Sequence, residues 1–292
     1  MSRCRFVSDH QADYPVARLC RLAGVARSSV YAWRERPPSA RQVANEALLE
    51  EIRLIHEASR CTYGRIRMLG QLRRRGNPAN HKRVARLMRL DGIRGLGGPG
   101  KRSRRHPGRH TAPAPDLLNR DFTADGPDQR WVADITEFRT LEGKLYLSGI
   151  LDLYANRLVG WAMAERRTAE IAVDALVMAI RRRRPTAGVI HHADHGSQYT
   201  SLVFCDRAHD EEVNLSFGRI GTAADNAAME AFWSVLKREL FHLYGHRAWP
   251  DRTSLRAALF EYIEVFYNRE RHQAGLEHQT PAEYESNAKE AA

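Results

Sequence analysis

Cysteine is scarce in this sequence, and its few cysteines do not stand in the pairs that zinc sites use. The 292 residues contain four of them, Cys4, Cys20, Cys61 and Cys205, which are far apart and form no CxxC pair. Neither a disulfide framework nor a structural zinc site is therefore expected. We expect the four thiols to be reduced and buried or incidental, in a cytoplasmic compartment.

The sequence also lacks any apolar run that approaches the ~20 residues needed to cross a bilayer. Its first residues contain no hydrophobic segment of the signal-peptide type, so no membrane partner is expected. Apolar residues make up 43% of the chain and charged residues 28%, as is typical of globular proteins. The length is sufficient for two or three domains.

Negative charge is sparse in the front half of the chain. Residues 1–125 carry 26 Lys and Arg against 11 Asp and Glu, a net charge of +15, whereas residues 126–292 carry 20 against 24, a net charge of −4. A strongly basic front half indicates a polyanion partner. The charge alone does not separate a DNA-binding protein from an RNA-binding one.

Two short helices are predicted in residues 1–40, on either side of a turn at Gly24. Ser28 is the expected N-cap of the second helix, and Arg27 and Arg34 are expected on its outer face. This pattern predicts a helix-turn-helix DNA-binding unit. The alternative is an ordinary helical hairpin with a solvated basic face.

A second helical, helix-turn-helix-like unit is predicted in residues 41–95. Ile66, Leu69 and Leu72 are expected to form the buried face of its middle helix, and Asn80 is the expected cap of its last helix. The basic side chains expected to contact DNA are Arg73, Arg74, Lys82, Arg83 and Arg86. Each of them alone is interpreted as a phosphate contact or a solvated charge rather than as a base contact.

Residues 96–126 are rich in Gly, Pro and basic residues and are interpreted as a basic linker. The pattern then changes to alternation, and a mixed sheet flanked by helices is predicted for residues 127–246, followed by a helical extension in residues 247–292. The predicted strands are 130–138, 145–153, 157–163, 189–193 and 213–217. The predicted helices are 168–184 with Thr168 as cap, 201–210, and one that begins at Asp225 or Asn226. The run Arg181–Arg184 suits the C-terminal end of a helix dipole, with DNA contact as the alternative.

Three carboxylates lie within or at the end of predicted elements of this region. Asp134 lies within an apolar strand, Asp194 ends another strand, and Glu230 follows 35 intervening residues later, after a Gly-containing loop at 218–224 that we expect to act as a hinge. If the fold brings them together, they must shift their pKa values or hold a cation. Oxygen ligands favour Mg²⁺ or Mn²⁺, and two such ions could promote an in-line displacement at phosphorus.

The residues around these carboxylates have more than one interpretation. Lys237 lies seven positions after Glu230 on the same helix face, where it could hold a phosphate. The alternative for Glu230 and Lys237 is that both are solvent-exposed charges at the edge of a helix. His195 is the best candidate for a substrate contact, and packing is the alternative for it and its neighbours. Asp152 precedes a turn and is interpreted as structural, with a supporting role near the site as the alternative. An apolar stripe on the same helix is interpreted as core packing: Met229, Phe232, Trp233, Leu236 and Leu240.

At these positions the chain resembles the DDE transposases with a retroviral-integrase-like core, and specifically the OrfB-type insertion-sequence transposases of the IS-three type. The resemblance lies in three blocks and extends to further segments: WVADIT (131–136), HHADHGSQYTS (191–201), DNAAMEAFWSVLKREL (225–240), GILDLYANRLVGWAM (149–163), YNRERHQAGLEHQTPAEYE (267–285), TYGRIRM (62–68) and KRVARLM (82–88). It covers about residues 14–285. Four residues depart from the family pattern, and none of these departures removes an expected ligand: Ala193, His195, Gln273 and Glu277.

The resemblance implies an RNase H-like catalytic core preceded by all-α DNA-binding units. It implies that Asp134, Asp194 and Glu230 are the catalytic residues and the ligands of two Mg²⁺ or Mn²⁺ ions, in an enzyme that nicks transposon ends and joins the 3′-OH to target DNA. It also implies a homo-oligomer on paired ends, an upstream OrfA product as a possible partner, and a location at the bacterial nucleoid.

Two other functions stay open from the sequence. One is a DNA-binding regulator whose catalytic core is silent without fusion to the upstream product. The other is a nuclease that hydrolyses RNA–DNA hybrids, against which the paired helical units and Lys237 argue.

Overall fold

The computed structural model describes residues 3–97, 115–119, 121–185, 188–218, 226–245 and 248–291. The chain forms two compact units, residues 1–53 (the first unit) and residues 54–292 (the second unit), each described here by itself. Most of the predicted linker, including residues 98–114, lies outside the described residues.

The first unit contains three short helices, α1 (Arg3–His10), α2 (Val16–Ala23) and α3 (Arg27–Arg34), and the first part of α4 (Ala40–Ala58). The predicted turn is confirmed, since Gly24 ends α2 with φ 62° in the left-handed region that glycine favours. A core forms between the first three helices from Val7, Leu19, Cys20 and Val30. The predicted Ser28 cap is wrong: α3 begins one residue earlier, Ala26 occupies the cap position, and no side chain caps the helix.

The helical part of the second unit, residues 54–97, contains the end of α4 and the helices α5 (Arg65–Arg74) and α6 (His81–Leu90). The Asn80 cap is confirmed, since its side chain accepts from the Lys82 N–H at 2.8 Å. The predicted buried face of α5 is wrong in part, because Ile66 is 64% exposed while Met68 and Leu72 are buried. Periodicity marks an apolar helix, but the neighbouring elements decide which of its faces is covered.

The sheet of the second unit has the strand order β3-β2-β1-β4-β5. Strands β1 (Arg130–Thr140), β2 (Gly143–Asp152) and β3 (Arg157–Ala164) are antiparallel neighbours, and β4 (Ile190–Ala193) and β5 (Asn214–Phe217) continue the sheet parallel to β1. A short β6 (Ala248–Trp249), which the sequence did not predict, also pairs with β1. The predicted mixed sheet is confirmed, and the predicted strands 145–153 and 157–163 pair as a hairpin across the turn at residues 154–156.

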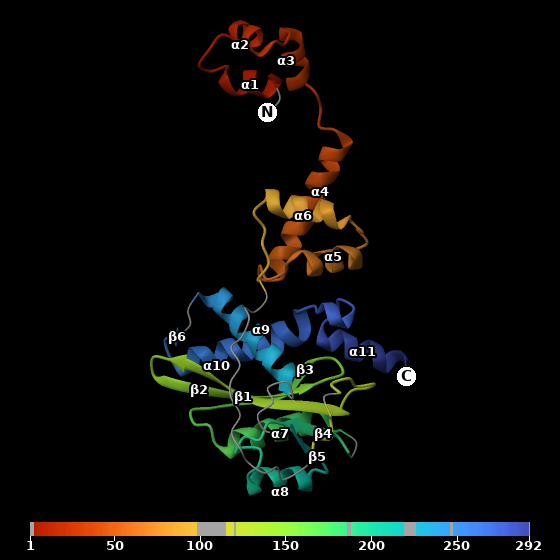
Figure 1. Cartoon of the computed structure of the whole chain (residues 1–292), viewed down its shortest axis with the longest axis vertical. Helices are drawn as coiled ribbons and strands as arrows, with labels where there is room; N and C mark the ends of the chain where they lie inside the picture. The colour runs from red at the N-terminus through yellow and green to blue at the C-terminus, as the bar shows by residue number, and fades with distance from the viewer. Residues whose placement is uncertain are drawn as a thin grey trace. The chain divides into compact units, whose positions relative to one another are not determined.

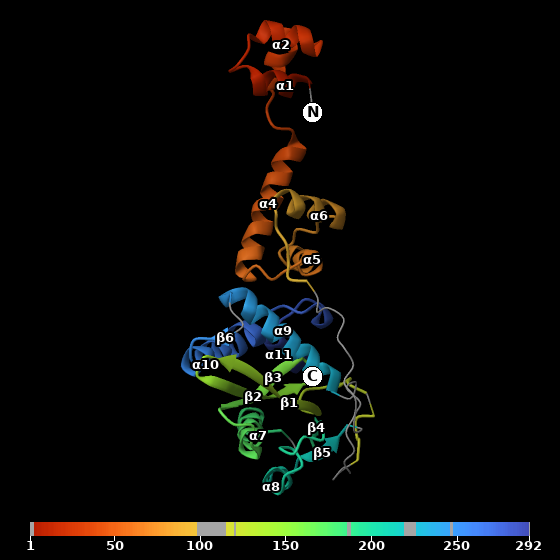
Figure 2. The same ribbon diagram turned by 60° about the vertical axis from the view of Figure 1, so that its left-hand side comes forward.

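Helices cover both faces of this sheet, as the two views in Figures 1 and 2 show. One face packs against α9 (Ala227–Tyr244), α10 (Arg252–Phe260) and the π-helical segment Glu261–Glu270 that continues α10. The other packs against α7 (Ala169–Arg183) and α8 (Leu202–Asp210), and α11 (Pro281–Ala291) ends the chain. The apolar stripe of α9 is fully buried, as predicted.

Two of the three predicted caps in this unit do not cap. Asn80 is the one that does, and α8 has a cap that was not predicted, because the Ser201 hydroxyl accepts from the Phe204 N–H at 3.3 Å. Thr168 and Asn226 occupy the cap positions of α7 and α9, yet neither side chain accepts from the helix. Instead, the Asn226 amide nitrogen donates to the Ala133 carbonyl of β1 at 2.9 Å. This contact fastens the start of α9 to the strand that carries Asp134.

The run Arg181–Arg184 has a role that the helix-dipole interpretation missed. Arg183 is buried and donates to Asp128, Asp152 and Glu285, with Nε to Asp128 Oδ1 at 2.7 Å and Nη1 to Glu285 Oε2 at 2.7 Å. Three acidic side chains from the start of β1, the end of β2 and α11 thus meet one guanidinium. Arg183 joins the C-terminal helix to the sheet.

Candidate active site

Asp134 lies in the middle of β1 on the face that α9 covers. The indole N–H of Trp233 donates to Asp134 Oδ2 at 3.0 Å. Burial, followed by the nearby charge of Asp194, raises the pKa of Asp134 to about 6. A carboxylate in this environment is costly unless something positive is brought to it.

The approach of Trp233 depends on a glycine opposite Asp134. Gly149 is the partner of Asp134 in the β1–β2 register. A Cβ at Gly149 would lie 2.7 Å from the tip of the Trp233 ring. The glycine therefore leaves the space in which a buried indole reaches the carboxylate.

Asp194 follows β4 directly, beside Asp134. The parallel register pairs Ala133 with Ala193, so the two aspartates stand at the next positions of neighbouring strands. The side chain of Asp194 is exposed, and its Oδ1 accepts from the Gly196 N–H at 3.1 Å. Sheet pairing thus brings two of the three predicted carboxylates together, where strand ends collect the sites of such folds.

Glu230 lies in the first turn of α9, four residues after Asn226, which holds that helix against β1. Across the part of the chain that the structure describes, no three Asp, Glu, His or Cys side chains lie close enough to hold a metal ion together. Glu230 therefore does not join the two aspartates in this structure. Residues 219–224 of the predicted hinge lie outside the described residues.

The three histidines around Asp194 are mainly packing residues. His191 is buried between Tyr199 and Phe204, and burial lowers the pKa of His191 to about 3, which keeps it neutral. The His192 Nδ1 lies 2.8 Å from the Ser216 hydroxyl. His195 stacks on Phe217 with ring centroids 5.5 Å apart, so its expected role as a substrate contact stays a prediction.

Asp152 is a structural residue rather than a member of the site. It is fully buried, and its two oxygens accept from the backbone N–H groups of Asp128 and Tyr154 at 2.8 and 3.0 Å. Burial raises the pKa of Asp152, and these N–H donors and Arg183 oppose the rise. The carboxylate fixes the turn after β2.

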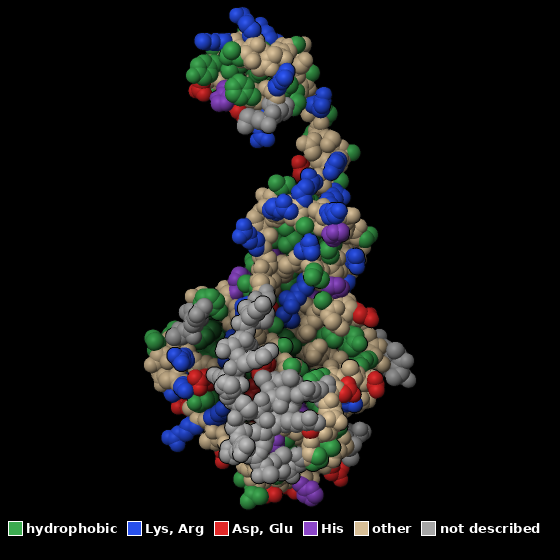
Figure 3. Space-filling view, in the orientation of Figure 1, with side chains coloured by type: hydrophobic (Ala, Val, Ile, Leu, Met, Phe, Trp, Pro, Cys, Tyr) green, Lys and Arg blue, Asp and Glu red, His purple; other side chains and the backbone are tan. Residues whose placement is uncertain are grey.

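The predicted DNA contacts are distributed over both units, and on the face shown in Figure 3 basic side chains gather over α5 and α6. Lys237 is exposed on α9, with its ammonium 5.2 Å from the centre of the Phe138 ring, on the strand that carries Asp134. The predicted contacts that are exposed are Arg27, Arg34, Arg73, Lys82 and Arg86, and Arg83 is half-buried. Arg74 instead donates to Glu283 and the His278 carbonyl, so much of its hydrogen-bonding capacity is already used within the chain.

Sequence reasoning missed the residues that support the carboxylates. Trp233 was assigned only to the apolar stripe, because periodicity says that a side chain is buried and not what its N–H meets. Tyr199 is buried next to the pair, and burial together with the charges of Asp134 and Asp194 raises the pKa of the Tyr199 phenol. The one signal available for Gly149 was a glycine inside a predicted strand.

Trp233→Phe tests the indole contact. Phenylalanine keeps most of the packing but cannot donate, so the charged form of Asp134 loses a stabilising hydrogen bond and the pKa of Asp134 should rise further above its ordinary range. We expect the reaction rate at this site to fall about tenfold at neutral pH. The acid limb of the pH–rate profile should move to higher pH, because Asp134 would lose its proton at a higher pH. A profile identical to that of the wild type would show that the contact does not tune Asp134.

Comparison with family models gives matches over most of the chain. The integrase core domain matches residues 124–223, a second integrase core domain model matches residues 230–288, and an HTH-like domain matches residues 44–99. Together with the observed strand order, the integrase models confirm the expected RNase H-like core and the helical region before it.

Relatives of known origin match along nearly the whole chain. An uncharacterized 31 kDa protein of insertion element IS600 from Shigella sonnei is 38% identical over 91% of this chain and 97% of its own length. Transposase InsF of insertion sequence IS3A from Escherichia coli K12 is 36% identical over 96% of this chain and 97% of its own length.

Solved structures that resemble the chain are more distant. A simian T-cell lymphotropic virus intasome chain is 17% identical, with a TM-score of 0.47 over 80% of this chain and 74% of its own. The HTLV-2 integrase catalytic core domain in complex with magnesium is 16% identical, with a TM-score of 0.43 over 56% of this chain and 99% of its own.

Proposed function

Because the chain belongs to the insertion-sequence transposases of the IS3 type, we propose that Asp134, Asp194 and Glu230 form its metal-dependent strand-transfer site. The proposed ligands would hold two Mg²⁺ or Mn²⁺ ions. The observation that supports this most is the pairing of β1 with β4, which sets two carboxylates side by side in a partly buried place.

The donors present fit such ions. Asp134 and Asp194 offer only oxygen ligands. Burial, followed by the charge of Asp194, raises the pKa of Asp134, and a bound cation would oppose this rise. When bound, divalent ions would supply Lewis-acid stabilisation of the leaving oxygen and a more acidic attacking hydroxyl. Glu230 would complete the ligand set when the ions and the DNA are bound.

The remaining roles belong to side chains of the chain itself. Trp233 holds Asp134 in one orientation through its indole N–H. Lys237 lies on the Glu230 face of α9 and would hold a phosphate beside the reacting one. Water and then the 3′-OH of the DNA would be the nucleophiles, so no covalent enzyme intermediate is needed.

In the first step, a water oxygen would bond to the phosphorus at the element end as the bond to the 3′ oxygen breaks; the water would lose a proton to solvent, and the 3′ oxygen would take one up to leave as a 3′-OH. In the second, the freed 3′-OH would attack a target phosphodiester, its proton leaving to solvent, and the target 3′ oxygen would leave. The proposed partners are the element ends and the target DNA. A second copy of the chain would bind the other end, and the upstream product would contribute further end binding.

Strand joining on a duplex that carries the element's own terminal inverted repeat tests the function. We expect joined product with Mg²⁺ and none after chelation by EDTA. Glu230→Gln and Asp194→Asn should abolish joining, whereas the exposed Asp210→Asn on α8 should not change it. Wild-type joining by either site variant would contradict the mechanism.

The assay is run with and without the upstream product. Joining only in its presence would favour the regulatory alternative for this chain alone. Preferential cleavage of an RNA–DNA hybrid would favour the nuclease.

A further inference from the structure

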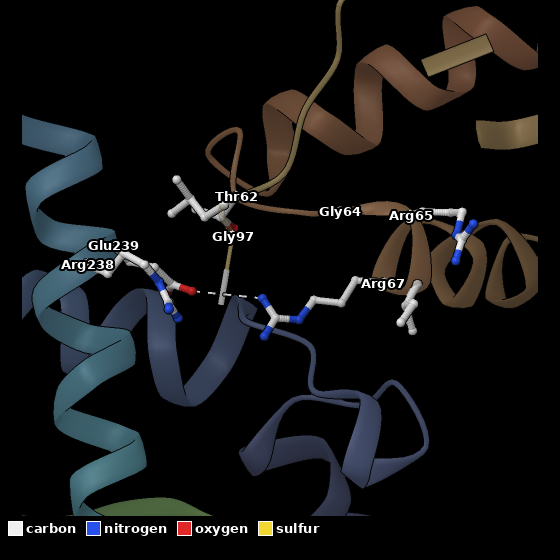
Figure 4. Close-up of a pocket in the computed structure, with 9 residues that line it drawn as sticks. Thr62, Gly64, Arg65, Arg67, Gly97, Arg238 and Glu239 are labelled. Atoms are coloured by element: carbon white, nitrogen blue, oxygen red, sulfur yellow. Dashed lines mark ion pairs between the residues drawn. The ribbon is translucent and has the colours of Figure 1, made fainter. Parts of the chain in front are cut away.

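A cavity of about 550 Å³ lies in the second unit between the start of α5 and the middle of α9. Its walls include Arg65 and Arg67 from the first turn of α5 and Arg238 and Glu239 from α9 (Figure 4). Arg67 and Glu239 point toward each other across it, 3.8 Å apart. It lies away from the candidate catalytic carboxylates, and none of them lines it.

Among the described residues that line the cavity, Glu239 carries the one carboxylate, and groups outside the cavity already neutralise its charge. Glu239 is buried and accepts three hydrogen bonds from the buried Arg271 at 2.9 to 3.1 Å. The hydroxyl of Tyr262 also donates to Glu239, at 2.7 Å. The charge of Glu239 is therefore shared mainly with Arg271, and the three arginines of the cavity are left with an excess of positive charge.

Several donors around the cavity are unused. Nε and Nη1 of Arg238 are shielded from solvent and have no hydrogen-bond partner among the described residues. Helix α5 starts at Gly64 without a side-chain cap, so its first N–H groups are available to an acceptor in the cavity. Burial and the neighbouring Arg271 lower the pKa of Arg67, as expected for a cation with too few anions around it.

The far wall is made by the chain that leaves the helical part. The Leu96 N–H donates to the Thr62 carbonyl at 3.1 Å. Gly95 lies against the backbone of Gly64, and a Cβ there would come within 2.2 Å of it.

We propose that this cavity binds a phosphate group of the nucleic-acid backbone, as a subsite of the strand transferase proposed above. Arg238 follows Glu230 by eight residues on α9, which corresponds to about 12 Å along the helix axis. At roughly 3.4 Å of rise per nucleotide, the bound phosphate lies about three to four nucleotides from the reacting one. Residues 54–97 and the catalytic core would then bind the same DNA strand.

Salt-dependent binding of the full chain to the inverted-repeat duplex tests the proposal, using Arg238→Gln, Arg65→Gln and a control, Arg207→Gln, which removes an arginine of α8 that pairs with Glu211. We expect each cavity variant to bind about tenfold more weakly and to lower the salt slope by about one, with the control close to wild type. Arg65 is exposed, so Arg65→Gln should fold even if Arg238→Gln does not.

Single methylphosphonates along the joined strand locate the subsite. Neutralising the phosphate three to four nucleotides from the reacting one should weaken the wild type but not Arg238→Gln further. An equal loss in both proteins, or unchanged salt slopes in both cavity variants, would overturn the subsite while wild-type joining still upheld the function. If the wild type neither binds nor joins, the proposed function fails instead.

Adding inorganic phosphate distinguishes a site for the DNA backbone from a site for free phosphate. If the cavity is made for the DNA backbone, 10 mM phosphate should compete only weakly with the duplex. If 10 mM phosphate raises the melting temperature of the wild type but not of Arg238→Gln, and the salt slopes do not differ, the cavity is a free-phosphate site and the backbone proposal is overturned.

Discussion

Asp134→Asn should lower strand joining at least about a thousandfold and, at pH 7 to 8, make the ligand-free protein more stable than the wild type. The loss of activity follows because an amide is a poor ligand for a divalent cation, and a thousandfold corresponds to roughly 4 kcal/mol of transition-state stabilisation. The gain in stability follows because the substitution removes a charge that burial and Asp194 both disfavour, while Trp233 can still donate to the amide oxygen.

The gain should depend on pH in one direction. The pKa of Asp134 is raised from 3.8 to about 6 in the folded chain, so between these values the folded state binds more protons than the unfolded state. The free energy of unfolding of the wild type should therefore fall as the pH rises through this window, by about 3 kcal/mol. The asparagine variant lacks this fall.

Chemical denaturation between pH 5 and pH 8, without divalent ions, measures the difference. The advantage of Asp134→Asn should grow toward pH 8, and the exposed Asp210→Asn should show none. A variant that is less stable than the wild type at every pH would mean that Asp134 is a structural residue.

Arg183→Met should reduce the free energy of unfolding by about 3 to 5 kcal/mol. Removing the guanidinium leaves Asp128, Asp152 and Glu285 close together and poorly solvated, which is the costly way to break a buried ion pair. Methionine fills much of the same volume, so the loss is electrostatic rather than a cavity effect. Urea denaturation at pH 7.5 gives the value.

The neighbouring Arg182 provides the control. Arg182 pairs with Glu264 at a more exposed position, and Arg182→Met should cost about 1 kcal/mol or less. The penalty of Arg183→Met should shrink toward pH 5, because burial raises the pKa of Asp152 and this carboxylate becomes neutral there once the guanidinium is gone. A penalty equal to that of Arg182→Met at pH 7.5 would show that Arg183 is not the centre of the cluster.

Local signals in the sequence were sufficient for most elements of the core sheet. Alternation located β1, and the cap at Asn80 was predictable because its side chain reaches an N–H only two residues away. The positions of Asp134 and Asp194 followed from motif and spacing, and sheet pairing confirms that they are neighbours.

What the sequence could not provide depends on partners far along the chain. Asn226 has the right residue type for a cap, but its amide donates to Ala133, 93 positions away. Arg183 belongs to the basic run Arg181–Arg184, which suits a helix terminus. Its burial becomes visible only when α11 packs against it and Glu285 accepts its hydrogen bond. The arginine-lined cavity needs residues 62–67 and 238 together, and no local pattern links them.

Glu230 is the residue on which the account depends most, because the spacing predicts it as a ligand and this structure does not bring it to the aspartates. The direct measurement is strand joining by Glu230→Cys and Glu230→Ser in Mg²⁺ and in Mn²⁺. A thiolate is a softer ligand than a carboxylate and suits Mn²⁺ better than Mg²⁺. We predict that both variants are inactive in Mg²⁺ and that Mn²⁺ restores joining at least about tenfold to the cysteine variant alone. Equal activity of the two variants in Mn²⁺, or wild-type joining by either in Mg²⁺, would contradict a metal-binding role for Glu230.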